Sequence, residues 1–283
     1  MSTQPLIALL TDFGLADAYV GTMKGVALSI CPQARLVDLT HAIQPQNVRQ
    51  AAYVLLTAFR HFPRHTVFLV VVDPGVGTAR EPVAVETTVG TYVAPNNGVL
   101  SYVLPHTTVR HAVALDNPAY HLPGVSQTFH GRDIFSPAAA HLAGGAPITE
   151  LGSPLPELAK QPDPALEIAP GRVRGEVLHI DHFGNVITSI GHLAWAGDSV
   201  LELDPQFGDQ RSESVRLHPD RCRVRIHDAS LDAIRRTYGA AAPGAPTPLV
   251  GSSGQLEIGV NQGSAAQVLG AALGDPVILE FDS

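Results

Sequence analysis

Residues 67–80 read VFLVVVDPGVGTAR, an apolar run that ends in a polar, glycine-rich segment. Six apolar residues in a row, most of them β-branched, are typical of a strand that is buried on both faces, as in a parallel sheet. The Asp73-Pro74-Gly75 sequence that follows favours a turn. In open parallel sheets, ligands bind where the strands end. Residues 67–80 therefore predict an α/β sheet with Asp73 at its functional edge.

On both sides of this strand, short apolar runs alternate with segments whose apolar residues recur at helical spacing. The expected strands are residues 6–10, 35–39, 67–72, 82–86, 92–94 and 109–114. The expected helices are residues 17–30, 46–62 and 134–142. This alternation predicts an α/β N-terminal domain, with a mostly parallel sheet flanked by helices on both faces.

The pattern changes after a stretch in which prolines stand at positions 154, 156, 162, 164 and 170. Proline at this density excludes regular helices and central strands. We therefore expect an N-terminal domain over residues 1–152, a proline-rich linker over 153–171 and a C-terminal domain over 172–283. In the latter, residues 174–190, 200–203, 214–226, 256–260 and 276–281 resemble strands, and residues 239–248 resemble a loop. Many strands and few helices predict a small all-β barrel.

Composition limits the partners of the 283-residue chain, which is 45% hydrophobic and carries a net charge of −8. An acidic surface does not attract nucleic acid or anionic lipid. No apolar run approaches the length of a membrane span, and no targeting segment precedes the first strand, so we expect a cytoplasmic protein. Cys31 and Cys222 form no CxxC pair. Buried, reduced thiols are therefore expected rather than a disulfide framework or a cysteine zinc site.

Polar turns follow three of the expected strands and should meet at one edge of the sheet. They contain Asp12, Asp73 and Asn97. Each alone suits an ordinary turn, but three together favour a ligand site. The chain has no GxGxxG after its first strand and no GxxxxGK[ST], so a bound nucleoside would not be held by its phosphates. Asp12 suits a ribose, because its two oxygens can each accept from one vicinal hydroxyl.

Two further polar segments have both a structural and a functional interpretation. Residues 128–137 place His130 directly before an apolar helix, where Asp133 would also suit a helix N-cap. Residues 251–254 place Ser252 and Ser253 between glycines. Their free backbone amides favour a nest for a carboxylate, whereas the alternative is a plain hairpin turn.

Residues 179–185 read HIDHFGN and suit the recognition of an adenine. Phe183 offers an apolar face, and Asn185 offers an amide edge. The two histidines and the aspartate of this segment also resemble a metal cluster. Strand alternation would send neighbouring side chains to opposite faces, and no HExxH accompanies them, so a metal site is the weaker alternative.

Six motifs, taken in order, resemble the S-adenosylmethionine (SAM) hydroxide adenosyltransferases, or SAM hydrolases. Their superfamily also contains the SAM-dependent fluorinases and chlorinases. The motifs are TDFG at 11–14, VVDPGVGTAR at 71–80, APNNG at 94–98, TFHGRDIFSPAAAHLA at 128–143, HIDHFGN at 179–185 and SSGQLEIGVNQGSAA at 252–266. Two residues depart from the family pattern: Ser189 stands where asparagine is frequent, and Gly259 where alanine is common.

The resemblance implies an α/β N-terminal domain, a C-terminal β-barrel and a homotrimer with each active site between the N-terminal domain of one subunit and the C-terminal domain of the next. It implies SAM as the substrate and no metal or redox cofactor. On the adenosine side, it implies that Asp12 holds the ribose hydroxyls and that Asn185 holds adenine together with an aromatic ring. The candidates for that ring are Tyr238 and Phe183. Asn97 is a further candidate contact.

On the methionine side, the resemblance implies that Asp181 binds the ammonium and that Ser252 and Ser253 bind the carboxylate. Halogenases of the superfamily carry arginine at the second of these serine positions. The fluorinase also has a long insertion between the strands that here run almost directly from residue 86 to residue 92.

The attacking water in the hydrolases lies among an Asp, an Arg and a His, and Asp73, Arg80 and His130 match those positions. Halogenases replace the first with tyrosine. Electrostatics also favours water over a halide as the nucleophile, because a halide beside the Asp73 carboxylate would meet like-charge repulsion. Arginine is always protonated and can stabilise hydroxide character, and histidine titrates near neutrality. Either Asp73 or His130 could be the proximal base. The alternatives to hydrolysis are a SAM-dependent halogenase, a non-catalytic SAM or adenosine binder, and a metal-dependent hydrolase.

Overall fold

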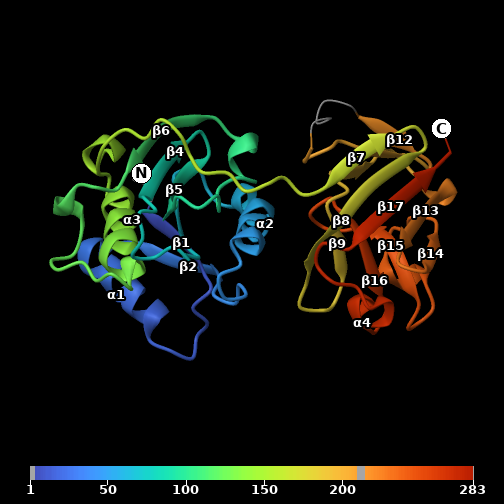
Figure 1. Cartoon of the computed structure of the whole chain (residues 1–283), viewed down its shortest axis with the longest axis horizontal. Coiled ribbons are helices and arrows are strands. Elements are labelled where there is room, and N and C mark those ends of the chain that lie inside the picture. Colours follow the sequence, from blue (N-terminus) through green and yellow to red (C-terminus); the bar gives the residue numbers. More distant parts are fainter. Residues whose placement is uncertain (1–3, 209–213, 283) are drawn as a thin grey trace. The chain divides into compact units, whose positions relative to one another are not determined.

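The chain folds into two compact units that divide between Gln161 and Pro162. The computed structural model describes residues 4–208 and 214–282 (Figure 1). The division falls inside the proline-rich stretch, and parts of that stretch are hydrogen-bonded to each of the two units. Leu155 N donates to Ala112 O at 2.8 Å in the N-terminal unit, and strand β7 (Leu166–Ala169) pairs with β8 (Arg172–Ile180) in the C-terminal unit.

The N-terminal unit contains a six-stranded sheet in the order β2-β1-β3-β5-β4-β6. The strands are β1 (Leu6–Thr11), β2 (Arg35–Thr40), β3 (Thr66–Val71), β4 (Pro82–Thr87), β5 (Gly90–Pro95) and β6 (Val109–Ala114). Neighbours β2-β1-β3-β5 are parallel, whereas β4 runs antiparallel to β5 and β6. The sheet is therefore mixed rather than only parallel in character. Only residues 88 and 89 separate β4 from β5, and a connection this short allows only a hairpin.

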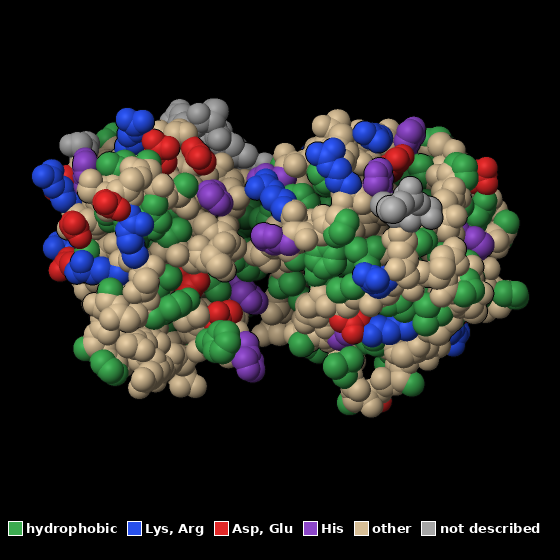
Figure 2. All heavy atoms as spheres, turned by 180° about the vertical axis from the view of Figure 1, so that it is seen from behind, with side chains coloured by type: hydrophobic (Ala, Val, Ile, Leu, Met, Phe, Trp, Pro, Cys, Tyr) green, Lys and Arg blue, Asp and Glu red, His purple; other side chains and the backbone are tan. Residues whose placement is uncertain are grey.

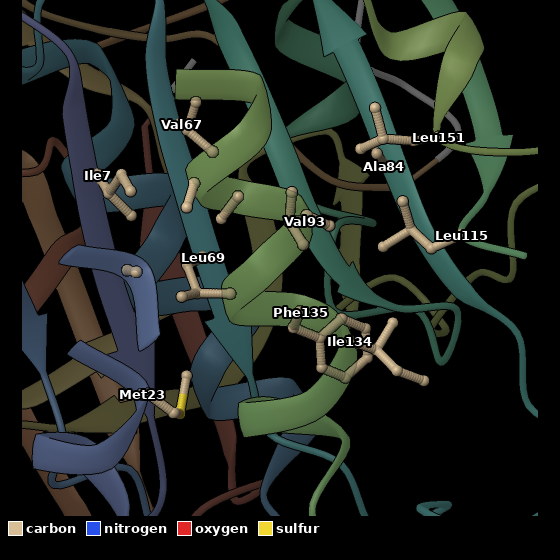
Figure 3. Close-up of a cluster of buried hydrophobic side chains, with 14 of the residues drawn as sticks. Ile7, Met23, Val67, Leu69, Ala84, Val93, Leu115, Ile134, Phe135 and Leu151 are labelled. Atoms are coloured by element: carbon tan, nitrogen blue, oxygen red, sulfur yellow. The ribbon is translucent and has the colours of Figure 1, made fainter. Parts of the chain in front are cut away.

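Helices cover both faces of this sheet. Figure 1 shows α1 (Tyr19–Ile30) and α3 (Ser136–Ala143) on one side and α2 (Val48–Ala58) on the other. Strand β3 is buried along its whole length, as its apolar run predicts. Ile7, Leu69, Met23 and Phe135 pack in the core beneath α1 and α3 (Figure 3). This packing anchors the loops at the strand ends on a rigid layer.

The C-terminal unit is built around an antiparallel sheet in the order β14-β13-β17-β8-β9-β16-β15, with β7 beside β8. Its further strands are β9 (Val186–Thr188), β13 (Cys222–Ile226), β14 (Ala229–Asp232), β15 (Pro246–Val250), β16 (Leu256–Val260) and β17 (Pro276–Phe281). Arg235 N, just after β14, donates to Pro248 O of β15 at 2.8 Å. The two ends of the sheet thus approach each other, and the sheet is nearly closed into a barrel. A small sheet of β10 (Leu193–Trp195), β11 (Leu201–Leu203) and β12 (Val215–Leu217) and the short helix α4 (Ala265–Leu269) complete the unit.

Three segment predictions for this unit need correction. The expected strand over residues 174–190 is two strands, because Asp181 to Asn185 form a tight turn between β8 and β9. The expected strand over residues 214–226 is broken by a turn at Pro219–Arg221. The expected loop over residues 239–248 ends in β15, which pairs with β16 and tolerates its prolines because it lies at the end of the sheet order.

The surface carries charges of both signs. Figure 2 shows basic and acidic side chains interspersed over the C-terminal unit. Several pair across neighbouring strands, such as Arg223 with Asp232 at 2.8 Å and Arg225 with Glu280 at 3.4 Å. Cys31 and Cys222 are buried free thiols, as expected. Across residues 4–208 and 214–282, every helix is too short or too polar to cross a bilayer.

Candidate active site

The N-terminal unit brings Asp73, Arg80 and His130 into direct contact. Asp73 follows β3, Arg80 precedes β4, and His130 lies at the start of the π-helical turn Gly131–Phe135 that leads into α3. Arg80 Nε donates to Asp73 Oδ1 at 3.0 Å, and Arg80 Nη2 donates to Asp73 Oδ2. Arg80 Nη2 also lies 3.2 Å from His130 Nδ1. The segment that carries Asp73 and Arg80 and the segment that carries His130, which are far apart in sequence, thus form one hydrogen-bonded cluster.

The Arg80 contact decides the tautomer of His130. A guanidinium only donates, so His130 Nδ1 must be the acceptor and carries no proton. The neutral ring therefore holds its proton on Nε2, which makes that atom a donor. Burial lowers the pKa of His130 below its ordinary value of 6.5, and the charge of Arg80 lowers it further. The ring is therefore neutral at neutral pH.

One nitrogen of the Arg80 guanidinium is left unpaired within the described residues. The Asp73 and Arg80 side chains are only 6% and 7% exposed. Arg80 Nη1 is buried and has no hydrogen-bond partner within the described residues. Buried donors of this kind are normally satisfied, so an unpaired one next to a carboxylate points to a bound water or ligand. Burial also raises the pKa of the Asp73 carboxyl, against the effect of Arg80, and so strengthens it as a base.

Asp12 stands at the end of β1 in a loop that is held by several bonds. Its Oδ2 accepts from Gln46 N at 2.7 Å. On either side of it, Thr11 Oγ1 lies 2.8 Å from the ring nitrogen Nδ1 of buried His41, and Gly14 N donates to His41 O at 2.8 Å. Within the described residues, Asp12 Oδ1 accepts no hydrogen bond. Neither Gln46 nor His41 was expected beside Asp12 from its local sequence pattern.

Asn97 lies at the end of β5 but uses its side chain within the fold. Its Nδ2 donates to Val72 O at 2.9 Å, and its Oδ1 accepts from Val99 N at 3.2 Å. These bonds hold the end of β5 to the residue that directly precedes Asp73. The structure therefore shows both polar atoms of the Asn97 side chain in hydrogen bonds within the fold, and a contact of Asn97 with substrate stays a prediction.

In the C-terminal unit, a cavity of about 550 Å³ gathers the second group of expected residues. Its lining includes Asp181, Phe183, Asn185, Tyr238 and Ser252. Ser253 follows in the chain but is not part of this lining within the described residues. The expected groups thus fall on both units. The Asp73–Arg80–His130 cluster and Asp12 lie on the first, and the candidates for binding adenine and methionine lie on the second.

The tight turn after β8 orders two of these side chains. Asp181 Oδ1 accepts from the backbone N–H groups of Phe183 and Asn185, each at 2.9 Å. Asp181 Oδ2 accepts from Asn185 Nδ2 at 2.9 Å. This contact fixes the amide nitrogen of Asn185 toward the carboxylate. Phe183 is 75% exposed at the tip of the turn, so its ring is free to cover a ligand.

Glu257 is a cavity residue that the sequence analysis missed. It is 7% exposed, lines the cavity and accepts a hydrogen bond from the Tyr238 hydroxyl. Burial raises its pKa, and the nearby charge of Asp181 acts in the same direction. The available signal was a lone acid inside the otherwise apolar strand β16.

The described residues contain no group of three or more His, Cys, Asp or Glu side chains placed to hold a metal ion. Another cavity, of about 720 Å³, lies on the C-terminal unit, but its lining is dominated by exposed charged groups that include the Arg223–Asp232 pair. The Asp73 cluster and the cavity that Glu257 lines both contain buried, hydrogen-bonded polar groups.

Comparison with known proteins finds the two domains of one family in the two units of this chain. Models of the SAM hydroxide adenosyltransferase N-terminal and C-terminal domains match residues 7–152 and 175–278. The chain belongs to the SAM hydroxide adenosyltransferase family. The family match covers the Asp73 cluster in its first part and the Asp181 cavity in its second.

The similar proteins include hydrolases and fluorinases. A protein from Thermus thermophilus, named (R)-S-adenosyl-L-methionine hydrolase, is 40% identical over 284 residues, which cover 96% of this chain and 98% of the relative. A fluorinase from Actinopolyspora mzabensis is 32% identical over 215 residues, which cover 66% and 72%. The crystal structure of an uncharacterized conserved protein from Thermotoga maritima superposes with a TM-score of 0.84 at 38% identity and covers 96% of this chain and 99% of that one.

Proposed function

We propose that this protein hydrolyses SAM to adenosine and L-methionine by attack of water on the ribose 5′ carbon. The observation that carries the proposal is the buried Asp73–Arg80–His130 cluster with its spare donor at Arg80 Nη1. The hydrolase name of the relative that matches almost the whole chain supports it.

The cluster assigns a role to each group. Asp73 accepts a proton from the water, because the lone pair of His130 Nδ1 is already used by Arg80. Arg80 Nη1 donates to the oxygen and stabilises its hydroxide character. His130 holds the guanidinium through Nδ1 and offers Nε2–H as a second donor. The oxygen–C5′ bond forms, the C5′–sulfur bond breaks with its electron pair going to sulfur, and the proton passes from Asp73 to solvent.

The leaving group needs no further help. Methionine departs from a sulfonium as a neutral thioether, so no general acid is required. No step calls for a metal or redox cofactor. Positioning the water opposite sulfur is the main remaining task, which rigid strand ends perform well.

We assign the binding of the rest of SAM by chemistry. Asp12 accepts from the ribose hydroxyls, and Asn185 with Phe183 and Tyr238 binds adenine. Asp181 takes the ammonium, and Ser252 with Ser253 takes the carboxylate. The two groups lie on different units, and we propose a homotrimer in which neighbouring subunits complete each site.

Incubation of the enzyme with SAM in water enriched in oxygen-18 should place the heavy oxygen on C5′ of adenosine. Mass spectrometry of the nucleoside product checks this. Unlabelled adenosine, or none, would contradict attack by water. The same reaction in high chloride or fluoride should still give only adenosine, because Asp73 repels a halide; a 5′-halo-5′-deoxyadenosine would point to a halogenase instead.

The acidic limb of kcat/KM should have an apparent pKa below 6.5. The pKa of His130 is lowered by burial and by Arg80, so the neutral ring that accepts from Arg80 persists to lower pH and is lost only below that range. Activity should therefore stay flat through neutrality and fall in acid. A pH–rate profile measures this, and in His130→Asn the acidic loss that remains should be that of the Asp73 carboxylate alone. A limb at or above 6.5 in the unmodified enzyme would exclude the assignment.

A further inference from the structure

The C-terminal cavity is lined in part by Tyr238 and Glu257, and Gly259 of β16 lies against the Tyr238 ring. The Tyr238 hydroxyl donates to Glu257 Oε1. The ring lies against the backbone of Gly259 in β16. A Cβ atom at position 259 would stand 2.5 Å from Tyr238 Cε1 and 2.7 Å from Cδ1, so only glycine leaves room for the ring in this place.

The same glycine leaves one atom of Asn185 uncovered. A Cβ at position 259 would also stand 3.1 Å from Asn185 Oδ1. The Asn185 nitrogen already donates to Asp181 at 2.9 Å and lies 3.5 Å from the Tyr238 oxygen. Because the Tyr238 proton goes to Glu257, the phenol oxygen can only accept from Asn185. The open polar atom of Asn185 is therefore its acceptor, Oδ1.

We propose that Glu257 and Gly259 are positioning residues that hold the Tyr238 ring and the Asn185 amide in place for a 6-aminopurine. This inference rests on the proposed function in taking the adenosine half of SAM as the ligand. Glu257 orients the ring through its hydroxyl, and Gly259 supplies the space. Asn185 Oδ1 then accepts from the 6-amino group of adenine, whereas a 6-oxopurine would present a lone pair to it.

Burial and the neighbouring Glu257 keep the Tyr238 hydroxyl protonated. Burial raises the pKa of Tyr238, and the Glu257 carboxylate raises it further, so the phenol stays protonated and remains the donor. Tyr238 itself is 40% exposed. Its ring can swing toward solvent once Glu257 or Gly259 no longer holds it, so the variants below should alter binding more than folding.

Gly259→Ala should weaken adenosine binding and reduce the preference for adenosine over inosine, each by roughly tenfold or more. The added Cβ would displace the Tyr238 ring and its hydrogen bond to the Glu257 carboxylate, and a hydrogen bond to a charged group is worth about that factor. Gly239→Ala is the matched control, because Gly239 lies beside Tyr238 and a Cβ there meets nothing within 4 Å. Isothermal titration of the full-length protein with adenosine and with inosine measures both quantities. Equal affinities in the two glycine variants would overturn the proposal.

Glu257→Gln should keep adenosine affinity within about threefold, because the amide oxygen still accepts from the phenol, whereas Glu257→Ala and Tyr238→Phe should each lose roughly tenfold. Losses that act through one hydrogen bond are not additive, so the Glu257→Ala/Tyr238→Phe double variant should be no weaker than either single one. Tyr120→Phe is the control, since it removes a comparable tyrosine–glutamate bond, Tyr120 OH to Glu150 Oε2 at 2.6 Å, in the other unit.

Additive losses, or a Glu257→Gln variant as weak as Glu257→Ala, would overturn the positioning role. If Glu257→Ala does not fold, the comparison of Tyr238→Phe with Glu257→Gln decides the same question. SAM turnover by the unmodified protein is measured alongside. Failure to form adenosine from SAM would contradict the proposed function alone, because the binding of free adenosine still tests the proposal.

Discussion

Asp73→Asn is expected to slow adenosine formation from saturating SAM by about 10²–10⁴-fold, the usual loss when a positioned general base is removed. Asparagine has nearly the same shape as aspartate and can still accept from Arg80 through one oxygen. It cannot take a proton from water. Adenosine affinity should change little, because the adenine contacts that we propose lie on the other unit. Single-turnover kinetics and adenosine titration measure the two effects separately.

Asp232→Asn is the matched control for this experiment. Asp232 also accepts from an arginine, Arg223 Nε at 2.8 Å, but its side chain is 74% exposed on the second unit. Its neutralisation should leave turnover unchanged. Equal losses of turnover and of adenosine affinity in Asp73→Asn would instead favour a non-catalytic binder of SAM or adenosine.

Arg80→Met should lower the free energy of unfolding by about 3–5 kcal/mol, because it leaves the Asp73 carboxylate buried without its partner. The Asp73 and Arg80 side chains are 6% and 7% exposed, so water cannot solvate the Asp73 carboxylate once the guanidinium is removed. The Asp73→Asn/Arg80→Met double variant should regain most of that loss, since no buried charge remains. Denaturant unfolding followed by circular dichroism measures both.

Arg223→Met breaks an exposed pair in the second unit and should cost about 0–1 kcal/mol. If Arg80→Met cost no more than this control, the Asp73–Arg80 pair would not be the buried, mutually dependent unit that the contacts describe.

Local patterns accounted for much of the first unit. The apolar run at residues 67–72 predicted the buried strand β3, which the structure confirms. The antiparallel direction of β4 was missed, although the two residues between β4 and β5 contained that information. In the second unit, residues 239–248 looked like a loop because proline and glycine are frequent there. Pairing with β16 nevertheless forms a strand over Pro246–Val250.

The residues of the candidate site also differ in how far local patterns reveal them. Motifs along the chain pointed to Asp12, Asp73, Arg80 and His130 as candidates, and to Asp181, Asn185 and Tyr238. No motif pointed to Glu257, because an acid in an apolar strand has no local pattern that reveals its partner. Asn97 was selected for its place at a strand end, whereas its amide is used to hold Val72 and Val99.

The sequence by itself determined the family, the two-part organisation and the residue types that the chemistry needs. These depend on order along the chain and on short-range periodicity. Only the tertiary structure decided that Arg80 donates to both Asp73 and His130 and that Gly259 makes room for Tyr238. The Arg80–His130 and Tyr238–Gly259 contacts join segments far apart in the chain, and no local pattern states the burial that raises the pKa of Asp73 and lowers that of His130.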